Sequence, residues 1–114
     1  MISEMEYAEF VDSLFAKNHI GVEGSVHAAL GIGGEAGEVV DMIKKHWTYN
    51  KPLDRAGLVE EIGDLMFYVQ ALCNLHGLTL GDAMEANVEK LTRRYPKGYS
   101  DAAALARADK NGSK

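Results

Sequence analysis

Two stretches of this chain, Glu35-Ala-Gly-Glu-Val-Val-Asp-Met-Ile43 and Glu61-Ile-Gly-Asp-Leu-Met-Phe-Tyr-Val69, repeat one nine-residue pattern. The copies match at an acid, a glycine, a second acid three residues after the first, two apolar residues and a final branched apolar residue. Both are typical of helices, because apolar residues recur at helical spacing and acids three apart lie on adjacent ridges. Packing the two helices through their apolar stripes therefore brings four carboxylates together.

The predicted stripes border the acids on each helix. The first contains Ile32, Ala36, Val39, Val40, Ile43 and Trp47, and the second contains Leu58, Ile62, Leu65, Val69 and Cys73. Four carboxylates on one surface repel one another and resist desolvation unless some are protonated or a cation lies among them. An all-oxygen set suits a hard divalent ion such as Mg²⁺, so we predict a metal site. The alternative is a solvated acidic face, on which Glu at i, i+3 is common.

Length and composition set the outer limits of the prediction. A chain of 114 residues is one domain, short for burying four long helices alone, so we expect self-association. The net charge of -5 argues against a nucleic acid polymer as partner. The only cysteine, Cys73, excludes a disulfide framework and a cysteine-based zinc site. Neither a signal peptide nor an apolar membrane span is visible, so we expect a soluble, cytoplasmic protein.

Capping signals predict where the helices begin and end. Ser3 with Glu6 caps the start of the first helix. The face of this helix predicted to reach the core carries Tyr7, Phe10, Val11, Leu14 and Phe15. The alternative is that its aromatic side chains stack on nucleobases. Residues 18–24 are predicted as a loop, which either covers a site or simply connects. Ser25 then caps a helix over residues 26–47, and Asp54 caps one that runs to His76 before Gly77.

The last part of the chain is expected to add a fourth helix and a tail. Thr79 with Asp82 caps that helix, which ends before Pro96 and directs Leu80, Ala83, Met84, Val88, Leu91 and Tyr95 toward the core. A single domain is predicted for residues 1–100. The tail, residues 101–114, is predicted to be a short helix after Ser100 followed by a frayed end.

Four glycines, at positions 31, 33, 34 and 37, lie inside the second predicted helix, where each costs about 1 kcal/mol relative to alanine. Close approach of another helix or of a ligand would compensate for that cost. Gly37 and Gly63 hold equivalent places in the repeat, so we expect helices two and three to touch there. A phosphate-binding glycine loop is the alternative, but no Gly-Lys-Ser/Thr follows and no strand precedes.

Candidate substrate-binding residues lie outside the acidic repeat. Trp47 either stacks on a base or caps the core. Asn87, Lys90 and Arg94 share one ridge of the fourth helix, which either holds phosphate oxygens or is a solvated basic face. None of the four histidines lies three residues from a helical acid, so a di-iron site of the Glu-x-x-His kind is disfavoured.

Three motifs in order resemble those of the all-α nucleoside triphosphate pyrophosphohydrolases, the MazG-like superfamily. Glu35-x-x-Glu38 is followed after 22 residues by Glu61-x-x-Asp64, and the run from Asn87 to Pro96 is similar to the family's Asn-x-x-Lys-x-x-x-Arg-x-Pro. The resemblance covers roughly residues 25 to 100. One departure concerns the first motif, where relatives often carry an additional acid beside it; this leaves the general base and the number of metal ions open.

The resemblance implies an all-α, four- to five-helix bundle that assembles as a dimer or a dimer of dimers. The implied activity is Mg²⁺-dependent hydrolysis (Mn²⁺ being a substitute) of a nucleoside triphosphate to the monophosphate and pyrophosphate, as nucleotide-pool house-cleaning. Glu35, Glu38, Glu61 and Asp64 would be the catalytic metal-binding acids, and Asn87, Lys90, Arg94 and, on weaker grounds, Trp47 would bind substrate. Two alternatives stay open: a phosphoribosyl-ATP or dUTP/dCTP-specific pyrophosphohydrolase, and a catalytically silent helical dimerisation or nucleotide-binding module.

Overall fold

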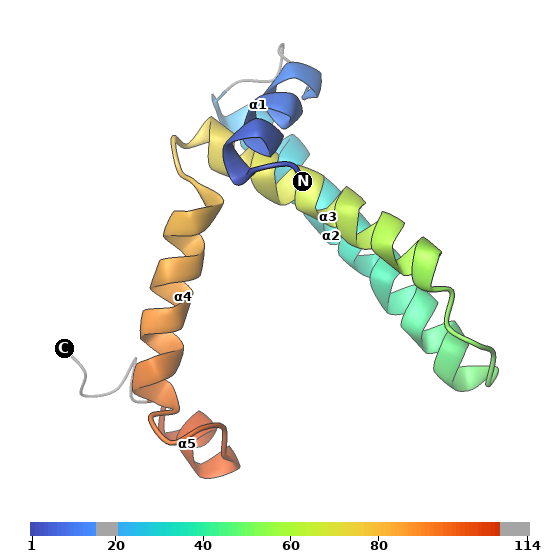
Figure 1. Ribbon diagram of the computed structural model, residues 1–114, viewed down its shortest axis with the longest axis vertical. Helices are drawn as coiled ribbons and strands as arrows, with labels where there is room; N and C mark the ends of the chain where they lie inside the picture. The colour runs from blue at the N-terminus through green and yellow to red at the C-terminus, as the bar shows by residue number, and fades with distance from the viewer. Residues whose placement is uncertain (16–20, 108–114) are drawn as a thin grey trace. The chain divides into compact units, whose positions relative to one another are not determined.

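The protein is all-helical across the residues that its computed structural model describes, 1–15 and 21–107. Its helices are α1 (Glu4–Leu14), α2 (Gly21–Thr48), α3 (Arg55–Leu75), α4 (Leu80–Arg94) and α5 (Asp101–Ala106) (Figure 1). The predicted all-α class is therefore confirmed. None of the described helices is both long and apolar enough to cross a membrane.

The chain divides into two compact units, Met1–Leu78 and Thr79–Lys114. The first unit contains α1, α2 and α3, and the second contains α4 and α5. The predicted single domain over residues 1–100 and the tail over 101–114 stay predictions. The short helix expected after Ser100 is present as α5, whereas the predicted frayed end lies outside the described residues.

The helix starts follow from the capping residues identified in the sequence. Ser3 and Thr79 both form complete capping boxes, in which the hydroxyl accepts from the third helical N–H and the acid at that position accepts from the cap N–H. The Asp54 carboxylate accepts from the Gly57 N–H at 3.0 Å and begins α3. Gly77 follows the end of α3 with φ +65°, a left-handed conformation that glycine adopts without strain.

The predicted start of the second helix was wrong. α2 begins at Gly21, so residues 21–24 are helical and not part of a loop, while the predicted loop residues 18–20 lie outside the described ranges. Ser25 is consequently inside the helix, and its Oγ hydrogen-bonds His76 Nε2 at 2.8 Å instead of capping. Gly24, one of the glycines that suggested a chain break, is a buried residue of the helix.

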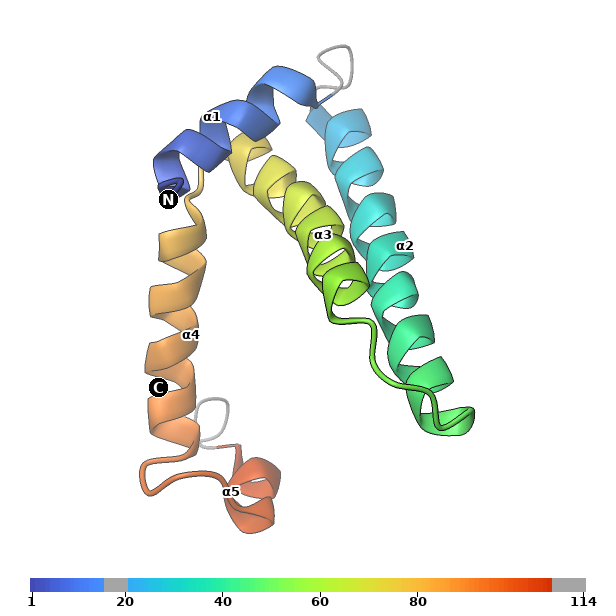
Figure 2. The ribbon, with the colours of Figure 1, turned by 45° about the vertical axis from the view of Figure 1, so that its right-hand side comes forward.

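α2 and α3 form an antiparallel hairpin, and α1 crosses the C-terminal end of α3 (Figures 1 and 2). The core lies at this crossing and consists of buried Val11, Phe15, Ala28 and Ala71, with Tyr7, Phe67, Tyr68, Leu72 and Leu75 packed against it. Two members of the predicted α1 core face, Phe10 and Leu14, are instead exposed. A short helix laid across a hairpin has one ridge facing inward, so only the Tyr7, Val11 and Phe15 row reaches the core.

The close contact between α2 and α3 occurs at a different glycine from the pair that the repeat suggested. A Cβ atom built on Gly37 or Gly63 meets nothing within 4 Å, so the predicted contact there is wrong. At Gly31 a Cβ would lie less than 3.0 Å from the Tyr68 ring. The absence of a side chain at Gly31 is what lets this aromatic ring lie against the α2 backbone.

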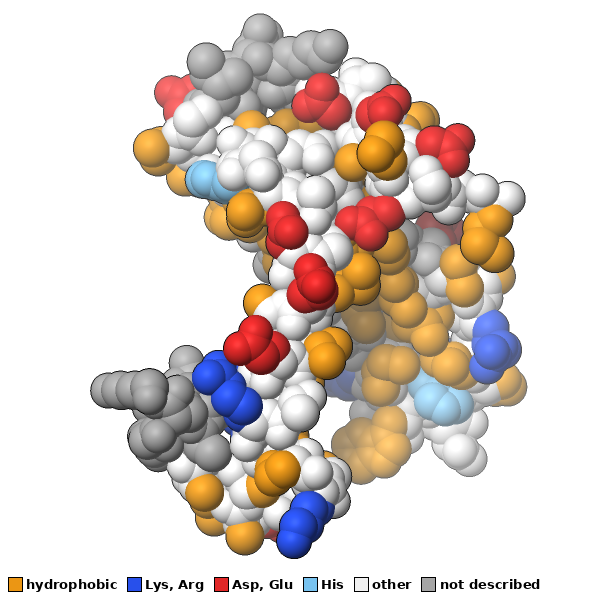
Figure 3. Space-filling model, turned by 60° about the vertical axis from the view of Figure 1, so that its left-hand side comes forward, with side chains coloured by type: hydrophobic (Ala, Val, Ile, Leu, Met, Phe, Trp, Pro, Cys, Tyr) orange, Lys and Arg blue, Asp and Glu red, His pale blue; other side chains and the backbone are white. Residues whose placement is uncertain are grey.

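Much of the predicted apolar stripe is exposed in the single chain. Ile32, Ala36 and Val39 are half-buried, but Val40, Ile43 and Ile62 are exposed. Leu30, which lies outside the predicted stripes, is also exposed, with 71% of its surface accessible. Figure 3 shows hydrophobic side chains exposed to solvent on the face of the α2–α3 hairpin that is in view. In the second unit, none of the α4 residues is buried, so the core face predicted for this helix is not buried by the described residues.

Candidate metal centre

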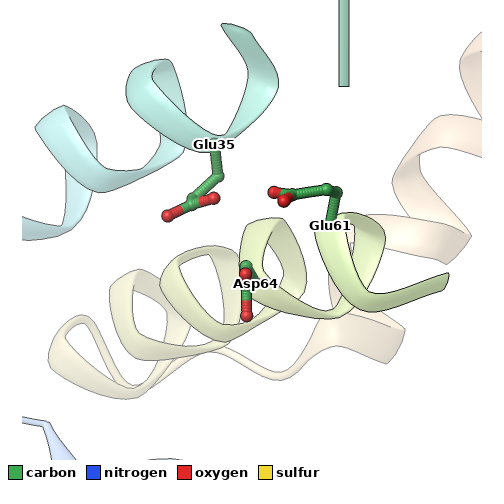
Figure 4. A group of neighbouring side chains, drawn as sticks. All are labelled: Glu35, Glu61 and Asp64. Atoms are coloured by element: carbon green, nitrogen blue, oxygen red, sulfur yellow. The ribbon is translucent and has the colours of Figure 1, made fainter. Parts of the chain in front are cut away.

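Three of the four repeat acids converge where the middle of α2 meets the N-terminal half of α3. Glu35 comes from α2, while Glu61 and Asp64 come from adjacent turns of α3. One carboxylate oxygen from each lies within 4.8 Å of the others. Figure 4 shows the Glu35 and Glu61 carboxylates pointing toward each other from the two helices, with Asp64 beside them on α3. The antiparallel hairpin thus brings together acids that are 26 residues apart in the repeat.

Glu38, the fourth acid, lies outside this group of three. It is exposed on α2, one helical turn after Glu35. Its charge nevertheless acts on Glu61, so the two carboxylates are close enough to interact through space.

The pKa of Glu61 is raised above its ordinary value of 4.5. Burial is the largest cause, followed by the negative charges of Glu35, Asp64 and Glu38 and a hydrogen bond with Glu35. Both effects disfavour the ionised carboxylate. A cation among these groups would reverse that balance, since opposite charge favours ionisation.

The donor set fits a hard divalent cation. One carboxylate oxygen from each of the three acids lies within 4.8 Å of the others, so a single cation among them would be within reach of all three. Carboxylates without thiolate or imidazole partners favour Mg²⁺ or Mn²⁺ over zinc or copper.

Comparison with known proteins identifies the family. A family model described as "MazG nucleotide pyrophosphohydrolase domain" matches residues 26–99, a range that contains all four repeat acids. The chain belongs to this family. The match confirms the resemblance that the motifs indicated, and it supports nucleotide pyrophosphohydrolase activity in general.

Two relatives of this MazG protein extend the comparison. Gene 37 protein of Mycobacterium phage L5 is 32% identical over 81 residues, which are 68% of this chain and 71% of that protein. "Uncharacterized protein YvdC" of Bacillus subtilis (strain 168) is 42% identical over 38 residues, which are 33% of this chain and 36% of that protein. No solved structure matches the chain.

The predicted phosphate-binding residues of the MazG chain lie on α4, in the second compact unit. Asn87 is exposed, while Lys90 and Arg94 are half-buried, and the three residues share one ridge of the helix. The Arg94 guanidinium carbon lies 5.9 Å from the centre of the Tyr95 ring, a cation–π geometry. Substrate contact by this ridge stays a prediction.

Trp47 lies in the last turn of α2 with 83% of its surface exposed. It therefore does not cap the core of its own chain, which was one of its two predicted roles. Trp47 is twelve positions after Glu35, so the two residues lie about 18 Å apart along the α2 axis. That separation is of the order of an extended nucleoside triphosphate, and base stacking by Trp47 stays a prediction.

Sequence reasoning assigned Tyr7 to the core, with base stacking as the alternative, and did not connect it with the acids. The pKa of Tyr7 is raised, first by burial and second by the negative charge of Asp64. Helical periodicity gives no signal for this, because a core tyrosine and a tyrosine near a site have the same spacing. Tyr68 was similarly missed as the residue that occupies the space above Gly31.

Proposed function

We propose that this MazG protein hydrolyses nucleoside triphosphates or deoxynucleoside triphosphates to the monophosphate and pyrophosphate with Mg²⁺. The observation that carries the proposal is the convergence of Glu35, Glu61 and Asp64 in a member of a nucleotide pyrophosphohydrolase family. Phosphoryl transfer asks little of a protein beyond positioning and neutralising charge. A cluster of carboxylates that holds a divalent cation satisfies both needs.

Glu35, Glu61 and Asp64 would hold the cation through one oxygen each. When bound, Mg²⁺ supplies neutralisation of the phosphate charge and a lowered pKa for a coordinated water. We assign the general base to Glu38, because it lies outside the converged group and yet interacts electrostatically with Glu61. A carboxylate in that position is free to accept a proton from the attacking water.

Asn87, Lys90 and Arg94 supply one amide and two cations on a single ridge, a set suited to phosphate oxygens and sugar hydroxyls. Trp47, exposed in the last turn of α2, is the residue that we assign to base stacking. The net charge of -5 supports small nucleotides rather than a nucleic acid polymer as the partner. The lone, unpaired Cys73 is compatible with the reducing cytoplasm as the compartment.

We also propose that the protein assembles as a homodimer or homotetramer. Only four apolar residues in the described part of the chain are buried, while the hairpin exposes Leu30, Val40 and Val59. Covering such a surface with a second copy is the usual way for a small helical unit to complete its core. Sedimentation equilibrium measures the mass of the assembly in solution. A monomeric mass at all micromolar concentrations would refute the proposed homodimer or homotetramer.

Pyrophosphate release from a panel of ribo- and deoxynucleoside triphosphates, with Mg²⁺ and with EDTA, tests the activity. We expect EDTA-sensitive release with one preferred base. Release of pyrophosphate from dUTP or dCTP alone would support the alternative that the protein is a dUTP/dCTP-specific pyrophosphohydrolase. No release from the panel would refute the broad activity, and phosphoribosyl-ATP then separates a specialised pyrophosphohydrolase from the silent nucleotide-binding module.

Variants at the acids separate their roles. Glu38→Gln and Asp64→Asn are both expected to abolish turnover with helicity preserved, but only Asp64→Asn is expected to weaken Mn²⁺ binding. Glu60→Gln is the matched control, because Glu60 is an exposed acid on α3 next to the cluster and outside it. Unchanged turnover in Glu38→Gln would remove Glu38 from the mechanism.

A further inference from the structure

The side of α2 that faces away from α3 has an apolar pattern of its own. Ala28, Gly31 and Glu35 lie on the side that faces α3, which runs along α2 (Figure 2). Nearly opposite, at about 100° per residue, lies a row that we call the outer seam: Val26, Leu30, Gly33, Gly37, Val40 and Lys44. All six residues are exposed. A surface helix normally presents polar residues to water, so an apolar row on this side indicates a partner.

The spacing of the outer seam is that of a coiled coil. Successive members are four, three, four, three and four residues apart, and this alternation keeps one stripe facing a partner helix along its length. The exposed fractions of Val26, Leu30 and Val40 are 50%, 71% and 65%. Another helix is therefore the kind of partner that fits the seam.

The outer seam keeps its pattern when it is read in reverse about a midpoint between Gly33 and Gly37. When two copies of α2 lie antiparallel about this midpoint, each seam residue faces a seam residue of the other copy. The facing pairs are Gly33 with Gly37, Leu30 with Val40, and Val26 with Lys44. A twofold axis requires such a self-complementary surface, in which residue i contacts residue j and j contacts i. A second copy of the chain therefore fits the seam along its whole length.

The sizes of the side chains fit this antiparallel pair. Gly33 and Gly37 carry no side chain, so the two helix axes can approach to about 8 Å at the midpoint, the short end of the range for packed helices. The N-terminal half of the same side of α2 has a hollow of about 490 Å³, lined by Val22, Glu23, Val26, His27 and Leu30. In the antiparallel register this hollow receives Val40 and the aliphatic stem of Lys44 from the other copy.

The charges on α2 favour the antiparallel arrangement. Glu23 is an exposed acid in the first turn, and Lys44 is an exposed base near the other end. Lys44 faces Val26 of the other copy, which lies about 4.5 Å along the helix axis from Glu23. Each Lys44 is thus within reach of the Glu23 of the other copy, and the twofold axis forms this pair twice. A parallel pair would instead bring the two Lys44 side chains together.

We propose that two copies of the chain associate through the outer seam of α2, with the helices antiparallel and crossing between Gly33 and Gly37. This inference rests on the proposed homodimer or homotetramer and names the surface that joins two of its chains. Glu35 lies on the opposite side of α2, so contact between two seams does not cover the acid cluster.

Opposite charges introduced at facing positions test both the surface and the register. Leu30→Glu and Val40→Lys each place a charge against an apolar residue of the other copy, so each is expected to raise the dissociation constant in sedimentation equilibrium by at least about 10-fold. The double variant Leu30→Glu/Val40→Lys pairs these charges in both halves of the interface, so it is expected to recover most of the lost affinity. Both residues are exposed in the single chain, so circular dichroism should show unchanged helicity.

Leu14→Glu is the matched control, because it makes the same change at a leucine that is 60% exposed but lies on α1, away from the seam. It is expected to leave the dissociation constant unchanged. An unchanged dissociation constant in Leu30→Glu, or an equal rise in Leu14→Glu, overturns the outer seam as the interface. A double variant that associates no better than the single ones overturns the antiparallel register.

The outcomes also separate this inference from the proposed function. A monomeric unchanged chain overturns both the outer seam and the proposed oligomer. A dimer or tetramer that Leu30→Glu and Val40→Lys leave intact overturns the seam alone. Pyrophosphate release by the unchanged chain is measured independently, so a failure of the proposed activity leaves the result on association as it stands.

Discussion

Gly31→Ala is the sharpest test of how α2 and α3 pack. The added Cβ would lie less than 3.0 Å from three atoms of the Tyr68 ring, including Cγ at the base of the ring. The ring has little freedom to retreat, because it meets Phe67 edge-on with centroids 5.2 Å apart and His27 with centroids 6.1 Å apart. The methyl group therefore forces either the ring or the helix backbone to move.

Two opposing effects set the expected change in the free energy of unfolding. Carbon atoms pack comfortably at about 3.5–4.0 Å, so relief of the contact requires a shift of roughly 1 Å. Overpacking of this kind costs about 1–3 kcal/mol. Alanine in place of glycine gains about 1 kcal/mol of helix propensity. We therefore expect Gly31→Ala to change the free energy of unfolding by between about 0 and −2 kcal/mol.

Gly33→Ala is the matched control. Gly33 lies two residues away in the same helix, and a Cβ there meets nothing within 4 Å. It has the same propensity gain without the steric cost, so it is expected to stabilise by up to about 1 kcal/mol. The difference between the two variants isolates the contact with Tyr68, at about 1–3 kcal/mol.

Urea unfolding followed by far-ultraviolet circular dichroism measures both variants. Protein concentration must be the same throughout, because association makes apparent stability depend on concentration. A thermal scan should show the same order, with about 4–8 °C for each kcal/mol. Equal stability of Gly31→Ala and Gly33→Ala would refute the reasoning, since the Tyr68 ring would then not be fixed above Gly31.

Two further predictions concern the acid cluster and the hydrogen bond that joins α1 to α3. In EDTA, the free energy of unfolding should fall as pH rises from 4.5 through the raised Glu61 pKa, because the folded state binds that proton more tightly than the unfolded chain. Glu61→Gln should flatten this part of the profile in urea titrations at several pH values. Asn74→Ala should lower the free energy of unfolding by about 1–3 kcal/mol, because it removes the donor to the Ala8 carbonyl and leaves Gln70 Nε2 without its acceptor.

Each of these has its own control. Glu60→Gln changes an exposed acid outside the converged group and should leave the dependence of the free energy of unfolding on pH unchanged. If Glu61→Gln and the unchanged chain had the same dependence on pH, the raised pKa of Glu61 would be contradicted. Ser13→Ala removes an exposed hydroxyl that donates to the Phe10 carbonyl at 2.6 Å and should cost less than Asn74→Ala. Equal costs would mean that the Asn74 bond does not anchor α1.

The sequence by itself determined the helices and the family. Ser3, Asp54 and Thr79 marked helix starts correctly, since caps act through the backbone of the next three residues and are therefore local. The spacing of the repeat acids, with the run from Asn87, also pointed to the MazG family, which the match over residues 26–99 confirms. The start of α2 was missed because glycines at 21 and 24 resemble a chain break when their packing is unknown.

Only the tertiary structure decided which side chains meet. The repeat treats Glu35, Glu38, Glu61 and Asp64 as equivalent, but the hairpin brings three within 4.8 Å and leaves Glu38 outside. The close contact of α2 with α3 is at Gly31 and not, as predicted, at Gly37. Periodicity assigns a residue to a face of its own helix, whereas the rotation and crossing of one helix on another depend on how all the side chains between them pack.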